Sequence, residues 1–337
     1  MTALHHRSRA GFTLIELLVV VAILAVLSAI GVGAFFRVRG SSEIKANETT
    51  VAKMTTGLNK AWSAGRDSAE KEFKDNTYSA QIATITTIAG GDRDRAKALW
   101  MYFRMKNEFP QTFAEAKAAT TFAVTVGGTV YSTNSTVVLP TLFLPAKRTY
   151  LANTALNTAV VPAPVAPVTA ADQVADQAAI LLYILITEKG SRGEMFADEA
   201  AGALTGKVTI GSNEFKVFTD TYGKPLTYAR YATNGEITTP PFTKTGVTSQ
   251  DPFDPLNKLG APWTIPGNAT QATPAVVAAG LGLTGFGVNW LPSIICSGPN
   301  KNFDGLNVAP TSGLVTIPTD TDNILGYRLR REGERGN

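Results

Sequence analysis

Histidine and cysteine are nearly absent from this sequence of 337 residues. The single cysteine, Cys296, has no partner for a disulfide within the chain. Both histidines, His5 and His6, lie at the extreme N-terminus. Without its first six residues, the chain would contain no histidine. This would exclude Ser-His-Asp and Cys-His nucleophile pairs and every histidine-ligated zinc or iron site. Chemistry that uses only carboxylates or lysine stays open as an alternative, but we expect a protein that is not an enzyme.

The sequence also lacks a strong charge of either sign. Its net charge is +4, with 44% hydrophobic and 17% charged residues, which is typical of a folded protein. Two of the basic residues, Arg7 and Arg9, lie in the leader, and no block of Lys and Arg follows elsewhere. The charge pattern therefore predicts no nucleic-acid partner.

One long apolar run lies near the N-terminus. Residues 12–36 read FTLIELLVVVAILAVLSAIGVGAFF, with Glu16 as their one charged residue. As a helix, these residues would rise about 37 Å, enough to cross a bilayer core of about 30 Å. Arg7 and Arg9 precede the run, which predicts a cytoplasmic N-terminus and an exported C-terminal body. Arg37 and Arg39 on the far side weaken this asymmetry slightly.

Three kinds of segment fit such a run: a secretory signal peptide, an uncleaved membrane anchor and a prepilin. Residues 9–16 read RAGFTLIE. This stretch closely resembles the processing motif of type IV prepilins and type II secretion pseudopilins, in which a short basic leader and Gly precede Phe-Thr-Leu-Ile-Glu. The resemblance implies that prepilin peptidase cuts after Gly11 and methylates Phe12. Residues 1–11 are then the leader, and residues 12–36 are the transmembrane helix.

Glu16 lies near the start of the apolar run. An intramembrane charge costs about 2.5–3.5 kcal/mol on insertion scales and therefore requires a partner. In the family that the motif resembles, the equivalent glutamate pairs with the N-terminal ammonium of a neighbouring subunit and sets the axial register of the filament. This implies an assembly role for Glu16. The alternative is a carboxylate that reaches the membrane interface within one helical turn of the helix end.

An amphipathic helix is expected to follow the apolar run. Apolar side chains recur along one helical face at Ile44, Val51, Met54, Leu58 and Trp62. Residues 37–65 are therefore predicted to form the soluble half of the N-terminal helix, with this face packed against a sheet. We expect the helix to end near Gly65.

The central region, residues 66–210, is predicted to be an insertion of helices and a hairpin. Residues 92–121 have a helical pattern that Pro110 divides in two, and Gly127-Gly128 between β-branched arms predicts a β-hairpin. Residues 154–171, rich in Ala, Val and Pro, are expected to form a linker of polyproline character. A buried helix is predicted from Asp172 to Thr187, with Asp172 as its N-cap and too short an apolar stretch for a second membrane span.

The C-terminal region, residues 211–337, is predicted to be rich in β-strands. Residues 215–228 have strand character broken by a turn at residues 222–225. They resemble the Asp-x-Trp-Gly-x-Pro segment of major pseudopilins, with Tyr222 in place of Trp. Residues 294–329 resemble the C-terminal loop of the same proteins.

In type II major pseudopilins that C-terminal loop binds calcium. The resemblance implies a Ca²⁺ site here, with oxygen ligands from Asn300, Asp304, Asp320 and Asp322. Asn300 stands where the family has Asp, and the intervening loop is longer. Asp and Asn also favour turns for purely local reasons, so an ordinary turn is the alternative.

These features together predict an α+β fold, in which a long transmembrane-plus-amphipathic helix packs on an antiparallel sheet. The expected function is structural: a pseudopilin or pilin held in the inner membrane, with its body in the periplasm. An inner-membrane assembly platform would assemble it with copies of itself and other pilin-like subunits into a filament. The alternative is a membrane-tethered periplasmic or surface binding module that does not polymerise.

Overall fold

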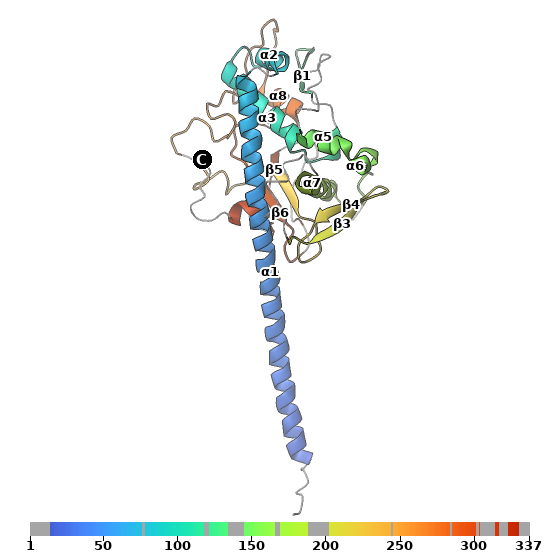
Figure 1. Cartoon of the computed structure of the whole chain (residues 1–337). Helices are drawn as coiled ribbons and strands as arrows, with labels where there is room; N and C mark the ends of the chain where they lie inside the picture. The colour runs from blue at the N-terminus through green and yellow to red at the C-terminus, as the bar shows by residue number, and fades with distance from the viewer. Residues whose placement is uncertain are drawn as a thin grey trace, which may run out of the picture. The chain divides into compact units, whose positions relative to one another are not determined.

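The computed structural model divides the chain into two units, residues 1–46 and residues 47–337. The residues that it describes are 14–75, 78–117, 121–133, 145–165, 169–187, 202–243, 245–283, 285–300, 303, 314–316 and 323–329. The predicted α+β class is confirmed, because a long apolar N-terminal helix is combined with shorter helices and antiparallel strands (Figure 1).

Helix α1 spans Leu14–Lys74 and does not end at Gly65 as predicted. A β-carbon added at Gly65 would lie 3.3 Å from both Met105 Sδ and Phe109 Cε2. Gly65 is therefore a point of close packing within the helix, and its lack of a side chain serves that contact. The last turn carries Lys71 and Lys74, which suit the negative end of the helix dipole.

The predicted apolar face of α1 is buried in the second unit from Val51 to Trp62, whereas Ile44 belongs to the first unit and is half-buried. Val51, Met54 and Leu58 are inaccessible to solvent, and Trp62 is 7% exposed. The Trp62 ring contacts Tyr231, with 5.8 Å between the ring centroids, and Tyr231 belongs to a central strand. The part of α1 that belongs to the second unit therefore contacts the sheet, as the amphipathic pattern predicted.

Three helices follow α1: α2 (Ser79–Ile88), α3 (Arg93–Glu108) and α4 (Phe113–Lys117). Pro110 lies between α3 and α4, which confirms the predicted division. Asp92 caps α3, because its carboxylate accepts hydrogen bonds from the amides of Asp94 and Arg95. Helix α2 was not predicted.

Strands β1 (Ala123–Val126) and β2 (Thr129–Ser132) form the predicted hairpin. They pair antiparallel, with Val126 opposite Thr129. Gly127 and Gly128 connect them with φ angles of 56° and 79°, values that glycine adopts without strain. The two-glycine turn is therefore what the hairpin requires.

The linker expected at residues 154–171 begins with a short helix instead. Helix α5 spans Pro145–Ala152, and α6 spans Thr154–Thr158. Asn153 caps α6, since its Oδ1 accepts a hydrogen bond from the Leu156 amide at 2.9 Å. The local capping signal at Asn153 therefore starts a helix in a stretch whose composition predicted extended chain.

Helix α7 spans Ala170–Thr187 and is capped by Thr169, not by Asp172 as predicted. The Thr169 hydroxyl accepts a hydrogen bond from the Asp172 amide, and the Asp172 carboxylate accepts one from the Thr169 amide. This reciprocal arrangement places Asp172 inside the first turn. The apolar residues Leu181, Leu182 and Leu185 are fully buried, so α7 is a core helix, as predicted.

The C-terminal strands form two sheets. Strands β3 (Thr205–Ile210) and β4 (Asn213–Phe218) make an antiparallel pair. The second sheet has the order β7-β5-β6-β8, with β5 (Thr227–Thr233), β6 (Leu291–Cys296), β7 (Leu314–Thr316) and β8 (Ile324–Leu325). Its pairs are antiparallel except for β5 with β7.

The remaining helices pack against these strands. Helix α7 packs against β4 and β5 (Figure 1). Helix α8 (Pro274–Leu281) packs against β1, and the 3₁₀ helix at Gly326–Leu329 adjoins β6.

Candidate processing and assembly site

The first turn of α1 carries Glu16. The predicted cleavage residues Gly11 and Phe12 lie outside the described residues. A carboxylate in the first turn interacts favourably with the positive end of the helix dipole. The residue to which the sequence assigned an assembly role is therefore placed at the N-terminal end of the helix.

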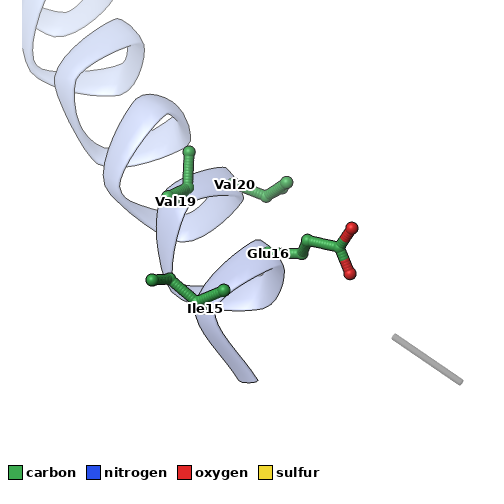
Figure 2. A pocket seen from close by; sticks show the side chains of 4 residues that line it. All are labelled: Ile15, Glu16, Val19 and Val20. Carbon is green, nitrogen blue, oxygen red and sulfur yellow. The ribbon is translucent and has the colours of Figure 1, made fainter. Parts of the chain in front are cut away.

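Glu16 is a single acidic side chain on an apolar surface. Figure 2 shows its carboxylate projecting from the helix, beside the side chains of Ile15, Val19 and Val20. The three apolar side chains are 69%, 49% and 47% exposed. The four residues line a shallow hollow on α1 itself. Such a surface suits either lipid or another apolar helix.

The apolar run remains exposed along its whole described length. Its large side chains, from Leu14 at 80% to Phe36 at 64%, make no core within the first unit. Among the described helices, α1 is the one long and apolar enough to cross a membrane. Exposed apolar area costs about 25 cal/mol per Å² in water, so this surface requires a covering of lipid or protein.

Residues 6–32 match the family model described as the prokaryotic N-terminal methylation motif. The chain carries the prepilin-type cleavage and methylation signal of type IV pilin-like proteins. The match includes Gly11, Phe12 and Glu16. No curated protein and no solved structure was found to match the chain. The signal and the exposed helix together indicate a pilin-like protein that is anchored in the membrane by one N-terminal helix.

Two C-terminal segments, residues 215–228 and 294–329, meet at Asp220. This carboxylate is 3% exposed. Its Oδ1 accepts hydrogen bonds from the amides of Tyr222 and Lys224, at 2.9 and 2.8 Å. Its Oδ2 accepts hydrogen bonds from the Ser297 hydroxyl at 3.2 Å and the Cys296 thiol at 3.3 Å. Asp220 therefore ties the turn before β5 to the end of β6.

The sequence prediction missed this role of Asp220, although a signal was present. An Asp that precedes a Gly by three positions is typical of a turn, because the Asp side chain can accept hydrogen bonds from amides a few positions later. The partner across the fold, Ser297, carries no such local signal. Helix α1 reaches the same turn, because Asn47 Oδ1 accepts a hydrogen bond from the Thr221 amide at 2.8 Å.

The candidate calcium ligands are only partly described. Asn300 lies at the turn after β6 and is exposed, while Asp304, Asp320 and Asp322 lie outside the described residues. In the described ranges, no group of three His, Cys, Asp or Glu side chains is arranged to hold a metal ion. Three carboxylates and one amide oxygen are ligands of the kind that Ca²⁺ prefers. A calcium site at this loop therefore stays a prediction.

Proposed function

We propose that this chain is a filament subunit, either a pseudopilin or a pilin, that prepilin peptidase cuts after Gly11 and methylates at Phe12. The match at residues 6–32 carries the proposal. It is supported by α1, whose first part is an exposed apolar surface and whose second part is built into a folded body. In this account the N-terminus is cytoplasmic, and the body lies in the periplasm of the cell.

Cleavage would place a positive charge close to Glu16. The new N-terminal ammonium of Phe12 has the sign opposite to the Glu16 carboxylate, and both lie at one end of an apolar helix. Ion pairs are strongest where water is excluded, as between helices that have left the lipid. An ion pair between Glu16 of one subunit and the Phe12 ammonium of the next would therefore favour one displacement of neighbouring subunits along the filament axis over all others.

Assembly would exchange one covering of the apolar surface for another. In the membrane, lipid covers the exposed side chains from Leu14 to Phe36. In a filament, the α1 helices of neighbouring copies and of other pilin-like subunits would cover the same side chains. The inner-membrane assembly platform would move the helix from the first environment to the second. The exposed apolar length of α1 supports such an exchange.

The test removes the carboxylate and keeps the helix. Glu16→Ala should leave membrane insertion and cleavage intact, because an insertion cost of about 2.5–3.5 kcal/mol disappears. Filament yield should fall by about tenfold, the effect of losing roughly 1.4 kcal/mol from each subunit contact. The matched control is Val19→Ala, which trims the same exposed face without changing its charge. Normal filament yield from Glu16→Ala, or an equal loss from Val19→Ala, would contradict the assigned role.

A tethered module that does not polymerise is separated from a filament subunit by shearing cells. Sheared filaments release the cleaved subunit into the supernatant without detergent. A tethered module stays with the membrane fraction until detergent dissolves the bilayer. Recovery of the cleaved protein only after detergent, in cells that express the assembly machinery, would contradict the filament proposal.

A further inference from the structure

Two arginines at the far end of the apolar run have different surroundings. Arg39 donates a hydrogen bond from Nε to Glu43 Oε1 at 2.9 Å, an ion pair between residues one turn apart. Arg37 is exposed and makes no hydrogen bond or ion pair with any described residue. The positive charge of Arg39 is therefore offset by Glu43, and the guanidinium of Arg37 is available to an external anion.

The position of Arg37 along the helix matches one edge of a bilayer. Residues 17–36, between Glu16 and Arg37, contain no charged side chain. Twenty helical residues rise about 30 Å, which equals the usual thickness of the hydrocarbon core. With Glu16 at the cytoplasmic edge, Arg37 therefore lies at the opposite edge, where the abundant anions are the phosphates of lipid headgroups.

The helix surface around Arg37 has room for a headgroup. The residues one turn away on either side are small: Gly33, Ala34, Gly40 and Ser41. A β-carbon added at Gly33 or Gly40 would meet nothing within 4 Å. The planar guanidinium of arginine presents a fork of donors that matches two oxygens of a phosphate. Charge, depth and space at Arg37 thus suit the same ligand.

We propose that Arg37 binds lipid phosphates at the far edge of the bilayer core and sets the depth at which the subunit is held in the membrane. Movement of α1 toward the cytoplasm would draw this guanidinium into hydrocarbon, so the contact resists that movement. It also keeps Glu16 near the cytoplasmic edge until the helix is extracted. The inference rests on the membrane anchoring of the proposed function and is independent of filament assembly.

The test measures helix depth in the full chain, reconstituted without assembly machinery into phosphatidylcholine vesicles. A reporter is introduced by Phe36→Trp at the end of the apolar run. Its quenching is compared between phospholipids brominated near the headgroup and near the bilayer centre. The native tryptophans Trp62, Trp100, Trp263 and Trp290 are at most 7% exposed and belong to the second unit, so they give a constant background.

With Arg37 present, the bromines near the headgroup should quench the reporter more strongly. Arg37→Gln should shift the ratio of the two quenching efficiencies at least twofold toward the bilayer centre, and Arg37→Lys, which keeps the charge, should restore much of it. The matched control Arg39→Gln/Glu43→Gln removes the neighbouring ion pair without changing the net charge, and should leave the ratio unchanged. An unchanged ratio for Arg37→Gln, or an equal shift for the control, would overturn the proposal.

Two further measurements identify the source of the anion that Arg37 binds. If lipid phosphate is the ligand, adding inorganic phosphate to the buffer should not change the depth, whereas a dependence on it would overturn the lipid assignment. The ratio should also be independent of the protein-to-lipid ratio. A depth that Arg37 controls only at high protein density would instead assign the contact to an acidic residue of another copy. Because every arm uses unassembled protein, a failure here differs from a failure of the Glu16 assembly assay.

Discussion

Replacing Asp220 with alanine should separate the two C-terminal segments that this carboxylate joins. The substitution removes the acceptor for the amides of Tyr222 and Lys224 and for the side chains of Ser297 and Cys296. A buried donor left without an acceptor costs about 1–3 kcal/mol, and hydrogen bonds to a charged group lie at the upper end of the usual range. The Ser297 side chain is fully buried, whereas the two turn amides are only partly buried and have water as an alternative. We therefore expect Asp220→Ala to lower the free energy of unfolding by about 3 kcal/mol.

The assay is urea denaturation of the detergent-solubilised chain, followed by tryptophan fluorescence. Trp62 and Trp290 lie in the core, with ring centroids 5.8 Å apart, so they report on the packing of the body. Asp220→Asn is the control, because its amide oxygen keeps the two turn amides bonded. It should lose about 1 kcal/mol. A loss below about 1 kcal/mol for Asp220→Ala, or equal losses for the two variants, would refute the hydrogen-bond reasoning.

Two further predictions concern pH and calcium. Burial, reinforced by the charge of Asp172 and opposed by Lys224, raises the pKa of Asp176 to about 6. The folded state therefore binds a proton more tightly than the unfolded state, and stability rises as the pH falls from about 6 to about 4. Asp176→Asn should stabilise the protein by about 1–2 kcal/mol at pH 7 and by little at pH 4, as measured by thermal melting at the two pH values. An equal effect at both pH values would contradict the raised pKa of Asp176. If the C-terminal loop binds calcium, millimolar Ca²⁺ should raise the melting temperature of the protein. At a free calcium concentration a hundredfold above Kd, the free energy of unfolding should increase by about 2.7 kcal/mol. Mg²⁺ should raise the melting temperature much less. Asp322→Ala should abolish this increment, and equal melting in calcium and in chelator would assign the four residues to an ordinary turn.

The sequence predicted the elements whose signals are local. The apolar face of α1, the division at Pro110 and the hairpin at Gly127-Gly128 depend on residues within a few positions of each other. The predicted helix end near Gly65 was wrong because the role of this glycine is set by residues far away in the sequence. A glycine that ends a helix and a glycine that admits a neighbouring side chain look alike, and the deciding contacts come from Met105 and Phe109.

Long-range contacts explain what the sequence did not predict. Helix α2 consists largely of Ile and Thr, which favour strands, yet it is helical with Ile82, Ile85 and Ile88 buried in the core. The ion pair of Arg230 with Glu115 joins β5 to α4 across more than a hundred residues, at 2.9 Å and with Arg230 fully buried. No periodicity or motif near either residue indicates such a pair.

The prepilin-type signal was recognisable in the sequence because it is linear. The prepilin peptidase motif lies in consecutive residues around Gly11, and the apolar run follows it directly, so no tertiary contact is needed to recognise either. The calcium prediction, in contrast, depends on residues that are far apart in the sequence. It requires Asn300 to meet three carboxylates from distant positions, and the sequence specifies the residue types without specifying that they meet.

The mature N-terminus is the most direct test of the central claim. The protein is extracted from membranes of cells that contain a prepilin peptidase, and its N-terminal peptide and intact mass are measured by mass spectrometry. The mature chain should begin at Phe12 and carry one added methyl group, and substitution of Gly11 by a larger residue should prevent the cut. A chain that retains Met1, or that begins at Phe35 after cleavage by signal peptidase, would contradict the central claim.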